Sequence, residues 1–145
     1  MRKLLDLAIV CFGLALLAGC QGKEAKTRAY YAQLDKMYKG YLSSDPKLAE
    51  RALLDHETII REWEKQGVGV VNYQESYKMT EARLLAVYVH MGEEQKARQE
   101  YQSLTNILAL HASRLNRAPK VGSPQEIVAD LERMETNLPV LWRMK

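Results

Sequence analysis

The chain has 145 residues, of which 47% are hydrophobic and 27% are charged, and its formal net charge at pH 7 is +3. This length is enough for one small domain with its own core, whereas two domains would be cramped. A charge balance this close to neutral argues against nucleic acid as a partner, because nucleic-acid binding usually needs a concentrated basic face.

The first 20 residues have the layout of a secretory signal peptide. Arg2 and Lys3 form a cationic start, an apolar run follows, and small residues precede Cys20. The uncharged stretch from Leu7 to Ala18 has only twelve residues, whereas a membrane-spanning helix needs roughly 20. We therefore expect this segment to be cleaved rather than to remain as a transmembrane anchor.

The end of this segment, Leu17-Ala18-Gly19-Cys20, resembles the lipobox of bacterial lipoproteins. The resemblance implies diacylglyceryl transfer to the Cys20 thiol, cleavage before it and often N-acylation, which attaches the protein to a membrane without spanning it. Stable anchoring of this kind takes two or more acyl chains. Gln21 follows, where Asp would favour the inner membrane. The family pattern thus implies the periplasmic face of the outer membrane in a bacterium with two membranes, and the outer face of the plasma membrane in a bacterium with one.

Cleavage divides the chain into a signal peptide (1–19), a short lipidated linker (20–24) and a single helical domain (25–145). The mature chain keeps 126 residues, and loss of Arg2, Lys3 and Asp6 lowers its net charge from +3 to about +2. Cys11 is removed with the signal peptide, so no disulfide framework is expected despite the oxidising destination.

Apolar residues recur at spacings of three and four, which predicts an all-α fold of about five helices in antiparallel hairpins. The pattern leaves open a closed bundle or a short open solenoid. The first helix is expected from about residue 25 to 42. A second helix is expected with Asp45 as its cap, Pro46 at its first position and Gly67 as its stop. The two apolar stripes comprise Tyr30, Leu34, Met37 and Tyr41, and then Ala49, Leu53, His56, Ile60 and Trp63.

Residues 67–71 are too short for a strand and are expected to form a loop. Asn72 and Glu75 resemble a capping box that starts a third helix, which ends near Met91 and is expected to be the most buried helix from residue 82 onward. Gly92 separates it from a fourth helix. The apolar stripe of that fourth helix comprises Ala97, Tyr101, Leu104, Leu108, His111 and Leu115.

Residues 112–123 are expected to form an exposed connection. Ser123-Pro124-Gln125-Glu126 has the sequence of a capping box with proline at the first helical position, and it predicts the start of a fifth helix. Pro139 is expected to close that helix, and residues 140–142 are expected to pack back on the other helices. The stripe of the fifth helix comprises Ile127, Leu131, Met134 and Leu138.

One stretch, residues 81–104, resembles a tetratricopeptide repeat. It has a first-helix leucine and tyrosine, an inter-helix turn, and a second-helix small residue and aromatic at the spacings of that repeat. The resemblance implies two antiparallel helices and a groove for a peptide or a helix. The residues that carry it are Leu84, Tyr88, Gly92, Ala97 and Tyr101.

Catalytic and metal-binding signatures are weak. His56-Glu57 begins like a zinc-protease helix, but Ile60 stands where the second histidine is needed. Three scattered histidines and no free thiol argue against a transition-metal site, and no phosphate loop or nucleophile elbow is present. We expect no cofactor and no enzyme activity. A hydrolase with a dispersed carboxylate pair stays open, because such a pair meets only in the fold.

Two surfaces are candidate interaction sites. Tyrosine is frequent, with eight tyrosines against one phenylalanine, and its ring with a polar tip suits a groove or interface; the alternative is packing between helices. A basic connection could contact anionic lipid or cell-wall polymer, or simply be solvated. The candidate residues are Tyr30, Tyr31, Tyr38, Tyr41, Tyr73 and Tyr77, and in the connection Arg114, Arg117 and Lys120.

These observations predict a lipid-anchored helical protein–protein interaction module. It would be an accessory or assembly subunit of a cell-envelope complex, tethered through Cys20 and bound to an envelope protein. The alternatives are a pilotin-like escort of an outer-membrane pore protein and the envelope hydrolase.

Overall fold

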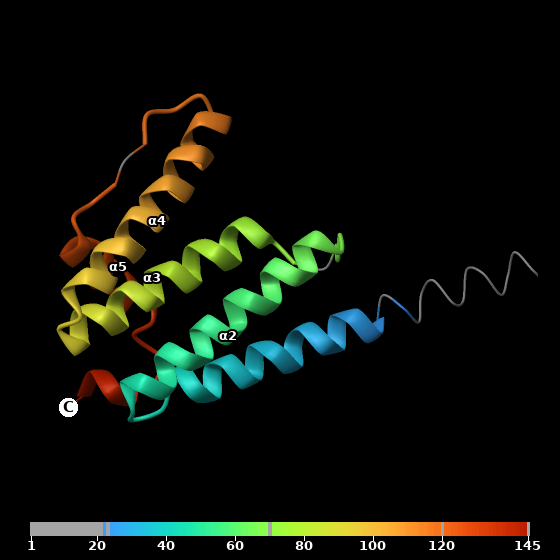
Figure 1. Ribbon diagram of the computed structural model, residues 1–145, viewed down its shortest axis with the longest axis horizontal. Helices are drawn as coiled ribbons and strands as arrows, with labels where there is room; N and C mark the ends of the chain where they lie inside the picture. The colour runs from blue at the N-terminus through green and yellow to red at the C-terminus, as the bar shows by residue number, and fades with distance from the viewer. Residues whose placement is uncertain (1–21, 23, 70, 120, 145) are drawn as a thin grey trace, which may run out of the picture.

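The computed structural model describes residues 22, 24–69, 71–119 and 121–144, so the signal peptide and Cys20 lie outside the described residues. Helical conformation already includes Gly22 and Glu24, which the sequence analysis placed in the linker. Among the described residues there is no strand, and the all-α prediction is confirmed. The elements in order are the first helix (24–41), α2 (Pro46–Lys65), α3 (Tyr73–Met91), α4 (Glu94–Arg114), α5 (Pro124–Met134) and the short 3₁₀ helix η1 (Leu141–Met144) (Figure 1).

The helix starts follow the local signals of the sequence. The Asp45 side chain accepts a hydrogen bond from the Lys47 N–H at 2.9 Å, and Pro46 is the first residue of α2. Asn72 accepts from the Glu75 N–H at 3.3 Å. At Ser123 both halves of the capping box are present. Each cap satisfies an N–H group that the helix leaves unpaired.

Helix α3 is the centre of the domain. It packs against α2, α4 and α5, and every residue from Thr80 to Tyr88 is buried. In Figure 1, α3 lies between α2 and α4, with the first helix on the far side of α2. This confirms the expectation that α3 is the most buried helix. None of the helices in the described ranges is long and apolar enough to cross a membrane.

The first helix and α2 form an antiparallel hairpin with a close contact near its turn. Tyr30, early in the first helix, lies with its ring centroid 5.9 Å from that of Trp63, late in α2. Near the turn, a Cβ added at Gly40 would lie only 2.4 Å from the Ala52 Cβ. Glycine at residue 40 therefore allows the two helices to approach more closely than any other residue would.

Helix α5 ends at Met134, earlier than predicted from Pro139. The residue after it, Glu135, is only 6% exposed and accepts hydrogen bonds from the Tyr41 hydroxyl at 2.7 Å, Arg83 Nε at 2.8 Å and Arg143 Nη2 at 3.0 Å. Trp142 is buried and donates from Nε1 to the Tyr41 carbonyl at 2.8 Å. We call Tyr41, Arg83, Glu135, Trp142 and Arg143 the C-terminal clasp. It confirms that the tail packs back on the helices.

Three residues of the predicted stripes are exposed instead. Leu131 of α5 and Glu135 just after the helix take the buried face, which leaves Met134 in solvent. Helix α4 continues to Arg114, beyond the predicted start of the connection at Ala112, and its last turns project past the neighbouring helices (Figure 1). His111 and Leu115 are exposed there because no helix covers them.

Candidate functional site

Helix α2 presents one face to the core and lines a groove on each side of that face. With 3.6 residues per turn, Ala52 and Ile59 lie on roughly the opposite face of α2 from Glu57 and Arg61. The first pair lines a groove shared with the first helix, which we call the outer groove. Arg61 lines a second groove shared with α3 and α4, which we call the acidic groove.

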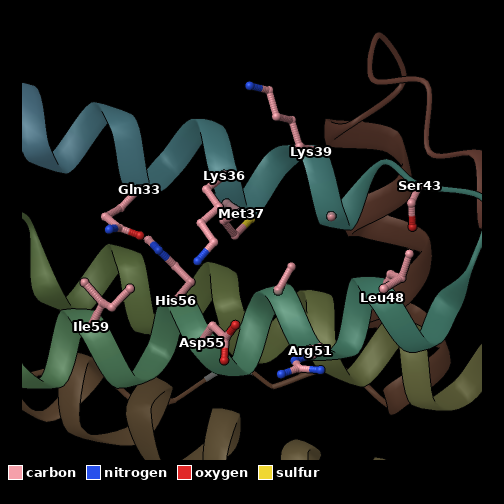
Figure 2. Close-up of a pocket in the computed structure, with 12 residues that line it drawn as sticks. Gln33, Lys36, Met37, Lys39, Ser43, Leu48, Arg51, Asp55, His56 and Ile59 are labelled. Carbon is pink, nitrogen blue, oxygen red and sulfur yellow. The ribbon is translucent and has the colours of Figure 1, made fainter.

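The outer groove has a volume of about 230 Å³ and lies between the first helix and α2 (Figure 2). Its apolar part includes Met37, Ala52 and Ile59, with Gly40 where the helices approach most closely. Leu48 extends this apolar surface and is 53% exposed. The other lining residues are Gln33, Lys36, Lys39, Ser43, Arg51, Asp55 and His56.

The edge of the outer groove is positively charged. Three cations and one acid, Asp55, line it. Lys39 points away from the groove in Figure 2 and pairs with Asp35 at 2.7 Å, whereas Lys36 reaches toward α2. Lys36 and Arg51 are therefore the cations that a bound segment would meet.

A buried histidine lies at the floor of the outer groove. The Nδ1 atom of His56 has no hydrogen-bond partner among the described residues. Burial and, to a smaller extent, the charge of Arg83 lower the pKa of His56, so the ring is neutral at pH 7. Figure 2 shows the Gln33 side chain directed toward this ring. The groove thus combines an apolar surface with a polar atom whose hydrogen-bonding capacity is unused.

The acidic groove lies between α2 and α4 over α3, with a volume of about 410 Å³. Glu81 of α3 lines it and is only 3% exposed. Glu100 of α4 is a neighbour of Glu81, and burial together with Glu81 raises the pKa of Glu100 to about 9. The lining residues are Arg61, Glu64, Lys65, Tyr77, Glu81, Ser103 and Ile107.

The candidate tyrosines do not form one surface. Tyr41 is fully buried in the C-terminal clasp, and the Tyr38 hydroxyl accepts a hydrogen bond from Arg83 at 3.0 Å. The prediction that Tyr41 is an interaction residue is therefore wrong, because its ring is buried in the core and its hydroxyl donates a hydrogen bond to Glu135. Tyr30 is half-buried against Trp63, and Tyr31 beside it is exposed.

The two tyrosines at the start of α3 serve different contacts. Tyr73 donates a hydrogen bond to the Val68 carbonyl, which fixes the loop before α3. Tyr77 donates to Glu64 at 2.8 Å and lines the acidic groove. Tyr31 and Tyr77 are thus the candidates that remain next to open surface or a groove.

The basic connection remains a candidate surface only in part. Arg114 and Arg117 are exposed, and Lys120 lies outside the described residues. No group of histidine, cysteine and acidic side chains within the described ranges is arranged to hold a metal ion.

Apart from Tyr77, the residues of both grooves were not predicted as interaction residues from the sequence. The edge residues Lys36, Leu48 and Arg51 belong to ordinary helical patterns, and nothing in their spacing distinguishes them. A signal for the acidic groove was present, because Glu81 and Arg83 interrupt an otherwise apolar part of α3. Charged residues within a buried helix need partners or a function.

No protein-family model, curated protein or solved structure matches the chain. The helical hairpin of α3 and α4 turns at Gly92, which has the left-handed φ of 70°, but membership of the tetratricopeptide family stays a prediction.

Proposed function

We propose that the protein is a lipid-anchored interaction module of the bacterial cell envelope, which binds a segment of an envelope partner in the outer groove. The first helix supplies one wall of this groove and directly follows the expected anchor at Cys20. Anchoring would hold the groove close to the membrane and raise its effective concentration for membrane-associated partners. The protein would act as an accessory or assembly subunit.

The observation that carries this proposal is an apolar groove with an exposed leucine and a positive edge. Leu48 leaves apolar surface in water, where a partner would bury it. Lys36 and Arg51 would meet acidic residues of that partner, since complementary charge fixes register and speeds association. The geometry favours an amphipathic helix with an apolar stripe flanked by Asp or Glu.

Charge reversal tests the groove. Cells carrying the wild-type protein, the double variant Lys36→Glu/Arg51→Glu, or the control Arg114→Glu/Arg117→Glu would be crosslinked, extracted with detergent and examined by mass spectrometry. We expect one dominant envelope protein, reduced about tenfold by the groove variant, because two reversed surface contacts of about 0.7 kcal/mol each give that factor. If the groove variant keeps the partner and the control loses it, the binding site is the basic connection and not the outer groove.

The anchor has its own test. In the wild type, mass spectrometry of the N-terminal peptide should find acyl chains on Cys20, and the Cys20→Ala variant should leave the membrane fraction. A mature protein that carries no lipid would contradict the anchor and leave the groove result unaffected. If the partner is an outer-membrane pore protein, the pilotin-like alternative is the more specific description.

A further inference from the structure

Glu81 is a buried carboxylate whose surroundings do not satisfy it. It is 3% exposed, and its Oε2 atom has no hydrogen-bond donor among the described residues. Burying an ionised carboxylate is costly unless donors or a counter-charge compensate it. Its neighbour across the helix interface is a second carboxyl group, Glu100.

The cations near Glu81 are already paired with other acids. Arg61 of α2 pairs with Glu57, and Lys65 pairs with Glu62 at 2.9 Å. Tyr77 donates its hydroxyl to Glu64 rather than to Glu81. The groups that surround the pair thus supply Glu81 with neither a donor nor a counter-ion of its own.

Charge around the acidic groove is unbalanced. Two acids, Glu64 and Glu81, line the groove together with two cations, Arg61 and Lys65, and both cations are paired with acids outside this lining. Glu100 of α4 lies near Glu81 and adds a further carboxyl group. Glu81, whose buried Oε2 atom lacks a donor among the described residues, lines a groove of about 410 Å³, a volume large enough for a long side chain.

We propose that the acidic groove binds a lysine or arginine side chain of a partner protein, with the cationic group held between the carboxyl groups of Glu81 and Glu100. This site is separate from the outer groove, on the other side of α2. Without a ligand, Glu100 holds a proton at pH 7, because its pKa is raised to about 9. Binding of the cation releases that proton to solvent, so that two carboxylates face one bound cation.

The probe for this site is 1,5-diaminopentane, a lysine-like diamine. The full chain in detergent micelles at pH 7 and 150 mM salt would be titrated and followed by ¹⁵N–¹H NMR. Calorimetry in two buffers of different ionisation enthalpy would count the protons released. We expect shifted amides on α3 and α4 around the pair, and release of close to one proton per bound diamine.

Two neutralising variants and one matched control sharpen the test. Glu81→Gln and Glu100→Gln should each weaken diamine binding about tenfold and abolish proton release, because a charge-assisted contact is lost. Glu94→Gln removes an exposed carboxylate from the first turn of α4 and should bind like the wild type. Circular dichroism would show that each variant is folded. Equal affinity in Glu81→Gln, Glu100→Gln and Glu94→Gln, or no shift in the folded wild type, would overturn the proposal.

Discussion

Two buried glutamates of this domain have opposite surroundings. Glu135 in the C-terminal clasp accepts hydrogen bonds from Tyr41, Arg83 and Arg143. Glu81 in the acidic groove has an oxygen without a donor among the described residues and a second carboxyl group beside it. The comparison shows that this chain supplies partners where a buried charge holds the fold together. Where it leaves a buried charge without them, stability is lost and a ligand is the group that would restore it.

The largest expected effect lies in the clasp. Glu135→Gln should lower the free energy of unfolding by about 3–5 kcal/mol, because Arg83 would stay buried without its counter-charge and half-buried Arg143 would lose its nearer carboxylate. Urea denaturation followed by circular dichroism measures this. Glu94→Gln, at an exposed glutamate of α4 away from the clasp, is the matched control and should change it little. If Glu135→Gln lowers the free energy of unfolding by less than about 1 kcal/mol, Glu135 does not stabilise the fold more than Glu81 does.

Packing between the first helix and α2 should be nearly as sensitive. Gly40→Ala should cost about 1–3 kcal/mol, because the added methyl group would overlap Ala52 and push the helices apart. Adding Ala52→Gly to this variant should recover most of the loss. If Gly40→Ala is instead as stable as the wild type, the first helix and α2 do not approach each other at Gly40 as closely as described.

Neutralising Glu81 should have the opposite effect on the free energy of unfolding. Glu81→Gln removes an unsatisfied buried charge and places an amide donor beside Glu100, so it should raise the free energy of unfolding by about 1 kcal/mol at pH 7. Urea denaturation under the same conditions as for Glu135→Gln gives the direct contrast. Destabilisation of both variants would mean that the two glutamates have the same structural role.

The smallest effect is a dependence on pH. Burial and Glu81 raise the pKa of Glu100 from 4.5 to about 9. Between pH 4.5 and pH 9, folding is therefore accompanied by uptake of a proton at Glu100. The contribution to stability is complete below about pH 4.5 and is lost as the pH rises through 9. The melting temperature of the wild type should therefore fall from pH 6 to pH 10 more than that of Glu100→Gln. Parallel curves for the two proteins would contradict the raised pKa.

Local signals explain why most helix boundaries could be predicted. Asp45-Pro46 and the capping box at Ser123 act within one turn of chain, so their effect does not depend on the rest of the fold. The end of α5 was predicted wrongly, because Glu135 is drawn into a contact with Tyr41 that spans 94 residues. No pattern within a helix reports such a contact.

The grooves could not be predicted for a related reason. The outer groove exists because Gly40 meets Ala52 across two helices, and its cations then lie at one edge. The pairing of Glu81 with Glu100 depends on how α3 and α4 pack. The number of tyrosines does not show which of them are buried. Tyr41 lies in the core, whereas Tyr31 is exposed.

Site-specific photo-crosslinking in living cells tests the proposed interaction module most directly. A benzophenone amino acid would replace Leu48 in the outer groove or, as the matched control, Leu110 on α4; these leucines are 53% and 54% exposed. We expect one discrete adduct with an envelope protein from position 48, strongly reduced in the Lys36→Glu/Arg51→Glu background and absent from position 110. Equal adducts from both positions, or none from position 48 in an acylated and abundant protein, would contradict it.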